Sequence, residues 1–186
     1  MRTFIAVEVA EPVRQSIDDR IKGFRAHSLP VKWVPYSNLH ITLKFLGEIS
    51  RNRQDEIEHL LEQGAQRHST FSVVLKDYGC FPNARNPRVL WIGVEKGSEE
   101  LRALADDIDE ILCKCGFTKD ARFHPHLTIG RIKKPCSLDH ILHQEFMSTS
   151  FEVSALFLFK STLTPQGAIY EPLIKCNFKL KSSNDN

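Results

Sequence analysis

The sequence lacks the cysteine pattern of a disulfide-stapled protein. Its 186 residues include five cysteines, an odd number, and none of them forms a Cys-x-x-Cys pair. This set excludes a secreted disulfide framework. We interpret the cysteines as free thiols, which predicts a protein of a reducing, cytoplasmic compartment.

Long apolar runs and an excess of one charge are also missing. No hydrophobic run approaches the length of about 18 residues that a membrane span needs, and the first residues contain no signal-peptide core or cleavage site. We therefore expect no contact with a membrane. With 25 Lys and Arg against 23 Asp and Glu, the net charge is only +2. This balance excludes bulk polycation binding to nucleic acid but leaves a local basic patch open.

Hydrophobic residues make up 41% of the chain and charged residues 26%, which is typical of a globular protein with a core. The length is that of about one domain, and no segment rich in Pro, Gly or Ser divides it. We expect a single domain over residues 1–186, in which the polar tail 181–186 is frayed.

Hydrophobic periodicity predicts about eight strands and about four helices. Alternating or β-branched segments predict strands at 3–9, 31–34, 39–45, 71–75, 89–94, 126–129, 151–160 and 169–180. Apolar residues at helical spacing predict helices that begin near Pro12, Ser50, Ser98 and Ser137. Strands and helices do not alternate regularly, which argues against a doubly wound parallel sheet and favours one α+β unit.

One short pattern occurs twice, on two predicted strands. Residues 40–43 (His-Ile-Thr-Leu) and 126–129 (His-Leu-Thr-Ile) both read His, apolar, Thr, apolar, and two chance copies would occur in about one chain in a thousand. Because residues i and i+2 of a strand share a face, each motif presents an imidazole and a hydroxyl together. If two lobes face each other, His40, Thr42, His126 and Thr128 converge on one cleft.

Two histidines and two threonines suit displacement at phosphorus. An in-line displacement needs a base for the attacking oxygen and an acid for the leaving oxygen, on opposite sides, and a neutral and a protonated imidazole fill these roles. The threonine hydroxyls would donate to the non-bridging oxygens. Two titrating imidazoles predict a bell-shaped pH–rate profile with limbs between about pH 5 and 8.

Two nearby cations are candidates for additional phosphate contacts. Lys44 shares the strand parity of His40, so we expect its ammonium at the rim of the cleft. Arg131 has the opposite parity to His126, so it reaches the phosphate only if the strand bulges or ends near Gly130. For both cations, an ordinary surface charge is the alternative interpretation.

The sequence resembles the two-histidine (2H) phosphoesterase superfamily, and within it the bacterial and archaeal RNA 2′,3′-cyclic phosphodiesterases, also called 2′-5′ RNA ligases. The likeness covers nearly the whole chain. Segments 38–48 and 123–131 match the two signature regions of the family. Segments 2–7, 87–91 and 161–170 resemble its opening strand, middle strand and closing hairpin.

The resemblance implies a bilobal α+β fold, with two antiparallel sheets facing a central cleft and helices on the outside. It implies hydrolysis of RNA 2′,3′-cyclic phosphate ends to 2′-phosphate ends without a metal or cofactor, and a reversible 2′-5′ ligation of RNA. His40 would be the proton donor and His126 the proton acceptor, although the two motifs are too alike to assign these roles by themselves. Thr42, Thr128 and Arg131 would bind the phosphate. RNA is the partner implied, and a monomer suffices.

Three alternatives stay open. The same chemistry would serve small cyclic nucleotides, an ADP-ribose cyclic phosphate or 2′-5′ oligonucleotides. A non-catalytic protein that binds RNA ends would not need both imidazoles. A metal hydrolase would use the H-x-H spacing of His124 and His126, but no further ligand accompanies that pair. Four aromatic residues are candidate base-stacking surfaces, although we interpret them mainly as core: Trp33, Tyr36, Phe45 and Phe81.

Overall fold

Nine strands, four α-helices and one 3₁₀ turn make up the computed structural model, which describes residues 1–120 and 122–180. The tail expected at 181–186 lies outside the described residues. The strands are β1 (Arg2–Glu8), β2 (Val31–Trp33), β3 (His40–Glu48), β4 (Phe71–Phe81), β5 (Val89–Lys96), β6 (His126–Ile132), β7 (Phe151–Val153), β8 (Ala155–Thr164) and β9 (Gly167–Asn177). The helices are α1 (Glu11–Arg25), α2 (Arg51–Ala65), α3 (Ser98–Cys113), α4 (Asp139–Leu142) and the 3₁₀ turn η1 (Tyr36–Asn38).

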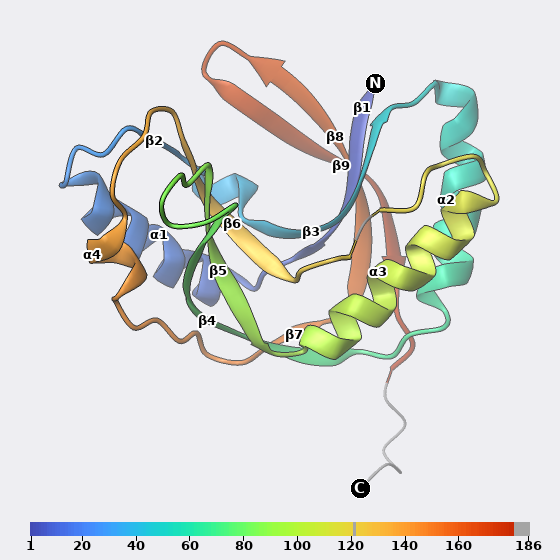
Figure 1. Ribbon diagram of the computed structural model, residues 1–186. Coiled ribbons are helices and arrows are strands. Elements are labelled where there is room, and N and C mark those ends of the chain that lie inside the picture. The colour runs from blue at the N-terminus through green and yellow to red at the C-terminus, as the bar shows by residue number, and fades with distance from the viewer. Residues whose placement is uncertain (121, 181–186) are drawn as a thin grey trace, which may run out of the picture.

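The strands form two antiparallel sheets, with helices on their outer sides (Figure 1). The four-stranded sheet has the order β3-β1-β8-β9, and the five-stranded sheet has the order β2-β6-β5-β4-β7. The expected α+β class with two antiparallel sheets is therefore confirmed. Within the described ranges, no helix is long and apolar enough to cross a membrane.

The strand expected at 71–75 is longer in the structure, where β4 runs to Phe81. Glycine usually weakens a strand interior, because it has no side chain to pack. In the structure, Gly79 pairs with Trp91, and a Cβ at Gly79 would lie 2.1 Å from the indole ring. The glycine thus makes room for a tryptophan within the sheet.

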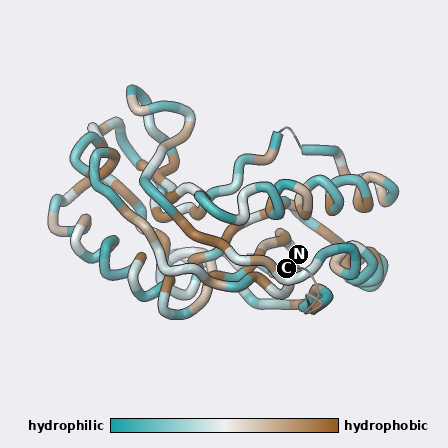
Figure 2. Tube along the Cα trace, turned by 90° about the horizontal axis from the view of Figure 1, so that it is seen from below, coloured by the Kyte–Doolittle hydropathy of each residue, from teal (hydrophilic) through white to brown (hydrophobic). Residues whose placement is uncertain are grey.

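The helices begin where the sequence predicts, but Ser50 and Ser98 do not cap them. Ser50 precedes α2 without a capping hydrogen bond from its side chain, and the N-cap of α3 is Gly97, at φ 86°, rather than Ser98. The helices are held instead by the apolar residues on their inner faces. Figure 2 shows hydrophobic segments running through the central strands, while the helices are mainly hydrophilic outside.

Two crossing connections join the sheets. Helix α1 follows β1 of the four-stranded sheet, yet its Phe24 packs on Trp33 and Tyr78 of the five-stranded sheet, with ring centroids 5.9 and 5.4 Å apart. Helix α3 follows β5 of the five-stranded sheet and lies against β3 of the other. Consequently, buried side chains from both sheets and from α1, α2 and α3 form one hydrophobic cluster.

Strand β3 carries a bulge directly after Thr42. The residues that pair with Thr42 and Lys44 are neighbours on β1, so Leu43 is the extra residue. A bulge moves every following side chain to the other face of the strand. Leu43 and Lys44 are accordingly both buried, and Phe45 follows Thr42 on the face of the sheet that carries His40.

Strand β6 carries the same bulge at the same place in its motif. The residues that pair with Thr128 and Gly130 are neighbours on β5, so Ile129 is the extra residue. Arg131 therefore follows Thr128 on the face that carries His126. The two halves of the molecule repeat both the His-x-Thr motif and the irregularity behind it, and Phe45 and Arg131 occupy equivalent positions.

Candidate active site

A cavity of about 550 Å³ lies between β3 and β6, and it brings together both motifs. Its lining includes His40, Thr42, His126, Thr128 and Arg131. The two strands belong to different sheets and meet at the centre of the molecule (Figure 1). The two motifs therefore converge on one cavity, as expected from the sequence.

The imidazole of His40 is held in one tautomer. Its Nδ1 lies 2.7 Å from the backbone oxygen of Asn38, and its Nε2 lies 2.9 Å from Oγ1 of Thr42. A carbonyl oxygen only accepts hydrogen bonds, so Nδ1 carries the hydrogen. In the neutral ring, Nε2 is then the acceptor, and the Thr42 hydroxyl donates to it.

His126 is held in the same way from the other sheet. Its Nδ1 lies 2.7 Å from the backbone oxygen of His124, so this nitrogen also carries the hydrogen and Nε2 is again the acceptor. In both motifs, the carbonyl two residues before the histidine fixes the ring. The chemically active nitrogen is therefore Nε2 in each case.

Both imidazoles favour the neutral form in the free protein. Burial lowers the pKa of His40 to about 4. The hydrogen bond to Asn38 acts to raise this pKa, and the charge of Arg131 lowers it further. Burial also lowers the pKa of His126, and the charge of Arg131 adds to the effect. A bound phosphate anion acts in the opposite direction, because an opposite charge favours imidazolium. The pH range expected from ordinary histidines therefore moves to lower values in the free protein.

Aromatic rings support the two histidines. The ring of Phe4 stacks on His40 at a centroid distance of 4.9 Å, and Tyr170 meets His40 edge-on at 5.3 Å. On the other sheet, Phe81 meets His126 edge-on at 5.0 Å. These contacts restrict the imidazole planes from the sides that the backbone hydrogen bonds leave free.

The four candidate stacking residues divide into two pairs. Phe45 and Phe81 line the cavity, and Phe45 is 61% exposed. Trp33 packs against Phe24 of α1, as expected of core. Tyr36 does not line the cavity. The guanidinium carbon of Arg14 lies over its ring, 5.1 Å from the ring centroid.

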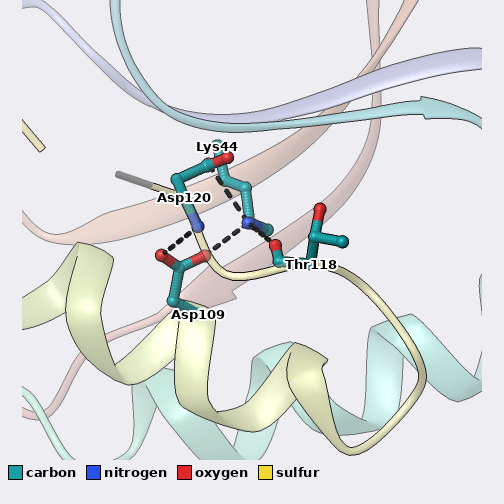
Figure 3. Close-up of polar contacts among 4 residues, drawn as sticks. All are labelled: Lys44, Asp109, Thr118 and Asp120. Carbon is teal, nitrogen blue, oxygen red and sulfur yellow. Dashed lines mark hydrogen bonds and ion pairs between the residues drawn. The ribbon is translucent and has the colours of Figure 1, made fainter. Parts of the chain in front are cut away.

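Lys44 does not share the strand face of His40 as expected, because the bulge in β3 reverses its direction. The side chain is only 3% exposed, and its ammonium forms an ion pair with Asp109 of α3 (Figure 3). It also donates to Asp120 Oδ2 at 3.1 Å and to the Thr118 carbonyl oxygen at 2.9 Å. Burial acts to lower the pKa of Lys44, but the hydrogen bonds to the two carboxylates outweigh it and raise that pKa. Lys44 lies at the edge of the cavity, and its hydrogen bonds to Thr118 and Asp120 hold the segment before β6.

The sequence motifs did not single out Asn38, which the structure places at the base of the site. Its side chain is buried, and its Nδ2 donates to the Ala168 carbonyl oxygen of β9 at 2.7 Å. A polar residue two positions before a histidine carries no signal by itself, because its partner is far away in the chain. Tyr170 was missed for the same reason.

His124 lines the cavity as a third, exposed histidine, with its ring 6.3 Å from that of His126. In the part of the chain that the structure describes, no three His, Cys, Asp or Glu side chains are grouped to hold a metal ion. The H-x-H pair therefore has no third protein ligand among these residues.

A two-sheet fold that presents two His-x-Thr segments to one cleft defines a two-histidine phosphoesterase. The model of the 2′-5′ RNA ligase superfamily matches residues 13–164. The chain belongs to this superfamily, which confirms the resemblance seen in the sequence.

Two relatives are named RNA 2′,3′-cyclic phosphodiesterase. The protein of Thermotoga maritima is 34% identical over 96% of both chains. That of Archaeoglobus fulgidus is 39% identical over 93% of this chain and 98% of its own. The expectation that the protein is an enzyme is thus confirmed.

Solved structures agree in fold. TT0787 of Thermus thermophilus superposes with a TM-score of 0.86, at 27% identity over 98% of this chain and 100% of its own. LigT of E. coli superposes with a TM-score of 0.78, at 25% identity over 96% of this chain and 97% of its own.

Proposed function

We propose that this protein hydrolyses the 2′,3′-cyclic phosphate end of RNA to a 2′-phosphate, without a metal ion. The observation that carries the proposal is the convergence of two imidazoles of fixed tautomer and two threonines on one cavity, with Arg131 beside them. The names of the relatives supply the substrate class. All of these groups come from one chain, which supports a monomer.

The reaction is an in-line displacement at phosphorus. Nε2 of His126 accepts a proton from water as the water oxygen bonds to phosphorus. The bond from phosphorus to the 3′ oxygen breaks, and Nε2 of His40 gives that oxygen a proton. Thr42 and Thr128 donate to the non-bridging oxygens, and the guanidinium of Arg131 balances the charge that develops there.

The proton of His40 comes with the substrate. In the free protein the pKa of His40 is about 4, so the ring is neutral at pH 7. The cyclic phosphate is an anion, and it raises that pKa when it binds beside the ring. Protonated Nε2 then donates, so the Thr42 hydroxyl that had donated to it becomes free to bind a phosphoryl oxygen. Binding of the substrate therefore also leads to protonation of His40, the proton donor of the reaction.

Ligation follows from the same geometry. If the 5′-hydroxyl of a second RNA takes the place of water, the same two proton transfers form a 2′-5′ linkage and release the 3′ oxygen. Hydrolysis dominates where water is in excess, and RNA ends held side by side favour ligation. The pair of motifs thus accounts for both activities with one site.

An assay in EDTA tests the proposal. The purified protein is given an oligoribonucleotide that ends in a 2′,3′-cyclic phosphate, and the position of the phosphate in the product is assigned. We expect a 2′-phosphate product and an unchanged rate in EDTA. A 3′-phosphate product, or a rate that EDTA abolishes, contradicts the proposal. Turnover of a 2′-5′ linked oligonucleotide in place of the cyclic end would favour the alternative substrate.

A further inference from the structure

One row of paired residues runs across four strands of the five-stranded sheet, at the mouth of the cavity. Lys32 of β2 pairs with Arg131 of β6, Arg131 with Val89 of β5, and Val89 with Phe81 of β4. Directly paired residues of antiparallel strands point to the same face. Arg131, Val89 and Phe81 line the cavity, so the exposed side chain of Lys32 also points to the cleft side.

Lys133 directly follows the last residue of β6. Its N–H donates to the Pro30 carbonyl oxygen at 2.8 Å, so the pairing with the β2 side continues past the end of β6. Lys133 is exposed and the residue before it, Ile132, is buried. By strand alternation, Lys133 points to the same face as Arg131.

In the part of the chain that the structure describes, these three cations form no ion pair with a carboxylate. Within residues 1–120 and 122–180, Lys22, Lys76 and Lys160 each form an ion pair with a carboxylate, whereas Lys32, Arg131 and Lys133 form none. Three unneutralised cations at one edge of a cleft attract an anion that extends beyond the site itself. The net charge of the protein, only +2, makes this local strip more distinctive.

The equivalent row of the other sheet contains no cation. Phe45 of β3 pairs with Phe4 of β1, and Phe4 pairs with Phe159 of β8. In addition, β3 is an edge strand, so no strand corresponds to β2 there. Of these two equivalent rows, only that of the five-stranded sheet therefore carries cations, and Arg122 lines the cavity from the segment before β6.

We propose that Lys32 and Lys133 bind the backbone phosphates of the nucleotides that precede the cyclic end, so that the natural substrate is an oligonucleotide and not a mononucleotide. This inference rests on the function proposed above. A cyclic mononucleotide has a single phosphate, which Thr42, Thr128 and Arg131 already match. The two lysines bind an anion only when the substrate continues. The RNA backbone thus leaves the site along β2 and the end of β6.

The test compares two substrates that end alike, adenosine 2′,3′-cyclic phosphate and a five-nucleotide RNA with the same cyclic end. In the double variant Lys32→Gln/Lys133→Gln, we expect kcat/KM for the oligonucleotide to fall at least about tenfold more than that for the mononucleotide. The slope of log(kcat/KM) against log salt should become shallower for the oligonucleotide by about 0.7 for each lost contact.

Arg88→Gln is the matched control. Arg88 is exposed and precedes Val89, so it points to the opposite face of the same end of the sheet, and its substitution removes a charge near the site. We expect it to leave the ratio of the two substrates unchanged. An equal effect of Arg88→Gln, or an equal loss on both substrates in the lysine variant, overturns the proposal.

A binding arm separates this inference from the proposed function. Binding of a fluorescent five-nucleotide RNA that ends in a 2′-phosphate is measured by anisotropy at several salt concentrations. If the wild type hydrolyses neither cyclic substrate, the proposed function fails, and this arm still decides the role of the lysines. Loss of RNA affinity in the lysine variant alone supports the basic strip, and equal affinity of wild type and variant refutes it.

Discussion

Asn38 holds His40 through its backbone carbonyl, which accepts the Nδ1 hydrogen at 2.7 Å. The side chain of the same asparagine donates to the Ala168 carbonyl oxygen at 2.7 Å. Ala168 lies in the β8–β9 hairpin that projects beyond the four-stranded sheet in Figure 1, and Tyr170 of this hairpin contacts the His40 ring. Asn38 therefore fixes both the tautomer of the imidazole and the position of the strand that packs against it.

Replacing the amide of Asn38 tests this coupling. Asn38→Ala keeps the backbone carbonyl but leaves the Ala168 oxygen without its donor, so we expect a loss of about 1–3 kcal/mol in unfolding free energy. We also expect kcat to fall more than KM rises, because Tyr170 no longer confines the ring. Asn38→Asp has the same shape but no donor, and it should lose at least as much. Wild-type kcat in Asn38→Asp would show that the hydrogen bond does not position His40.

Removal of either cleft imidazole should abolish the proposed acid–base chemistry. We expect His40→Ala or His126→Ala to lower the hydrolysis rate at least about 100-fold, while each variant unfolds near the wild-type temperature. His143→Ala is the control, since His143 is exposed and also donates from Nδ1 to a backbone oxygen, at 2.7 Å, but lies outside the cavity. Near wild-type activity in either cleft variant removes the two-histidine mechanism.

The pH dependence of kcat/KM should differ from that of kcat. In the free enzyme both imidazoles have lowered pKa values, that of His40 about 4, so the form with one protonated ring is populated at acidic pH. The bound phosphate raises these values. Since kcat/KM reports the free enzyme and kcat the complex, we expect both profiles to be bell-shaped, with the kcat/KM optimum at the lower pH. Coincident optima, with limbs at ordinary histidine values, would contradict this burial effect.

The same shift predicts how stability depends on pH. A histidine whose folded pKa lies below its unfolded value of 6.5 stabilises the fold above that value, and the contribution is lost as pH falls toward the folded pKa. For His40 the window is pH 6.5 to about 4, and acidification through it costs up to about 3 kcal/mol of unfolding free energy. Urea unfolding of wild type and His40→Gln across this window measures it. The variant should lose less stability on acidification than the wild type.

The sequence predicts this site only as far as it predicts the face of the strand to which each side chain points. Strand alternation correctly placed His40 with Thr42, since the alternation holds as far as the bulge. It failed for Lys44, and it allowed Arg131 only on condition of a bulge near Gly130, which the structure contains. Neither bulge follows from residue types, because each depends on the register with a neighbouring strand. Contacts across the fold, such as that of Asn38 with Ala168, are invisible for the same reason.

The two positions just after the bulges show why local sequence was insufficient. Lys44 and Gly130 are equivalent in the repeat, yet they face different neighbours. Gly130 lies under β2, where a Cβ would be 2.6 Å from Val31. β3 has no strand outside it, and Lys44 instead donates to Thr118 and Asp120 of the segment that leads to β6. Equivalent positions of the repeat thus carry a lysine in one sheet and a glycine in the other, because their neighbours differ.

Lys44 should therefore act on stability and on the placement of β6, and not as a phosphate ligand. Lys44→Met removes the buried ammonium and leaves Asp109 beside Asp120 without a cation, so we expect a loss of about 3 kcal/mol in unfolding free energy. Among the contacts in Figure 3, the Asp120 N–H donates to Asp109 at 3.1 Å, so the segment before β6 should loosen as well. Urea unfolding and amide exchange over residues 114–120 and 122–125 measure the two effects. The control is Lys76→Met, which breaks an exposed ion pair with Glu95 and should cost less than about 1 kcal/mol. If Lys44→Met instead retained full stability but bound phosphate more weakly, the ammonium would belong to the phosphate site after all.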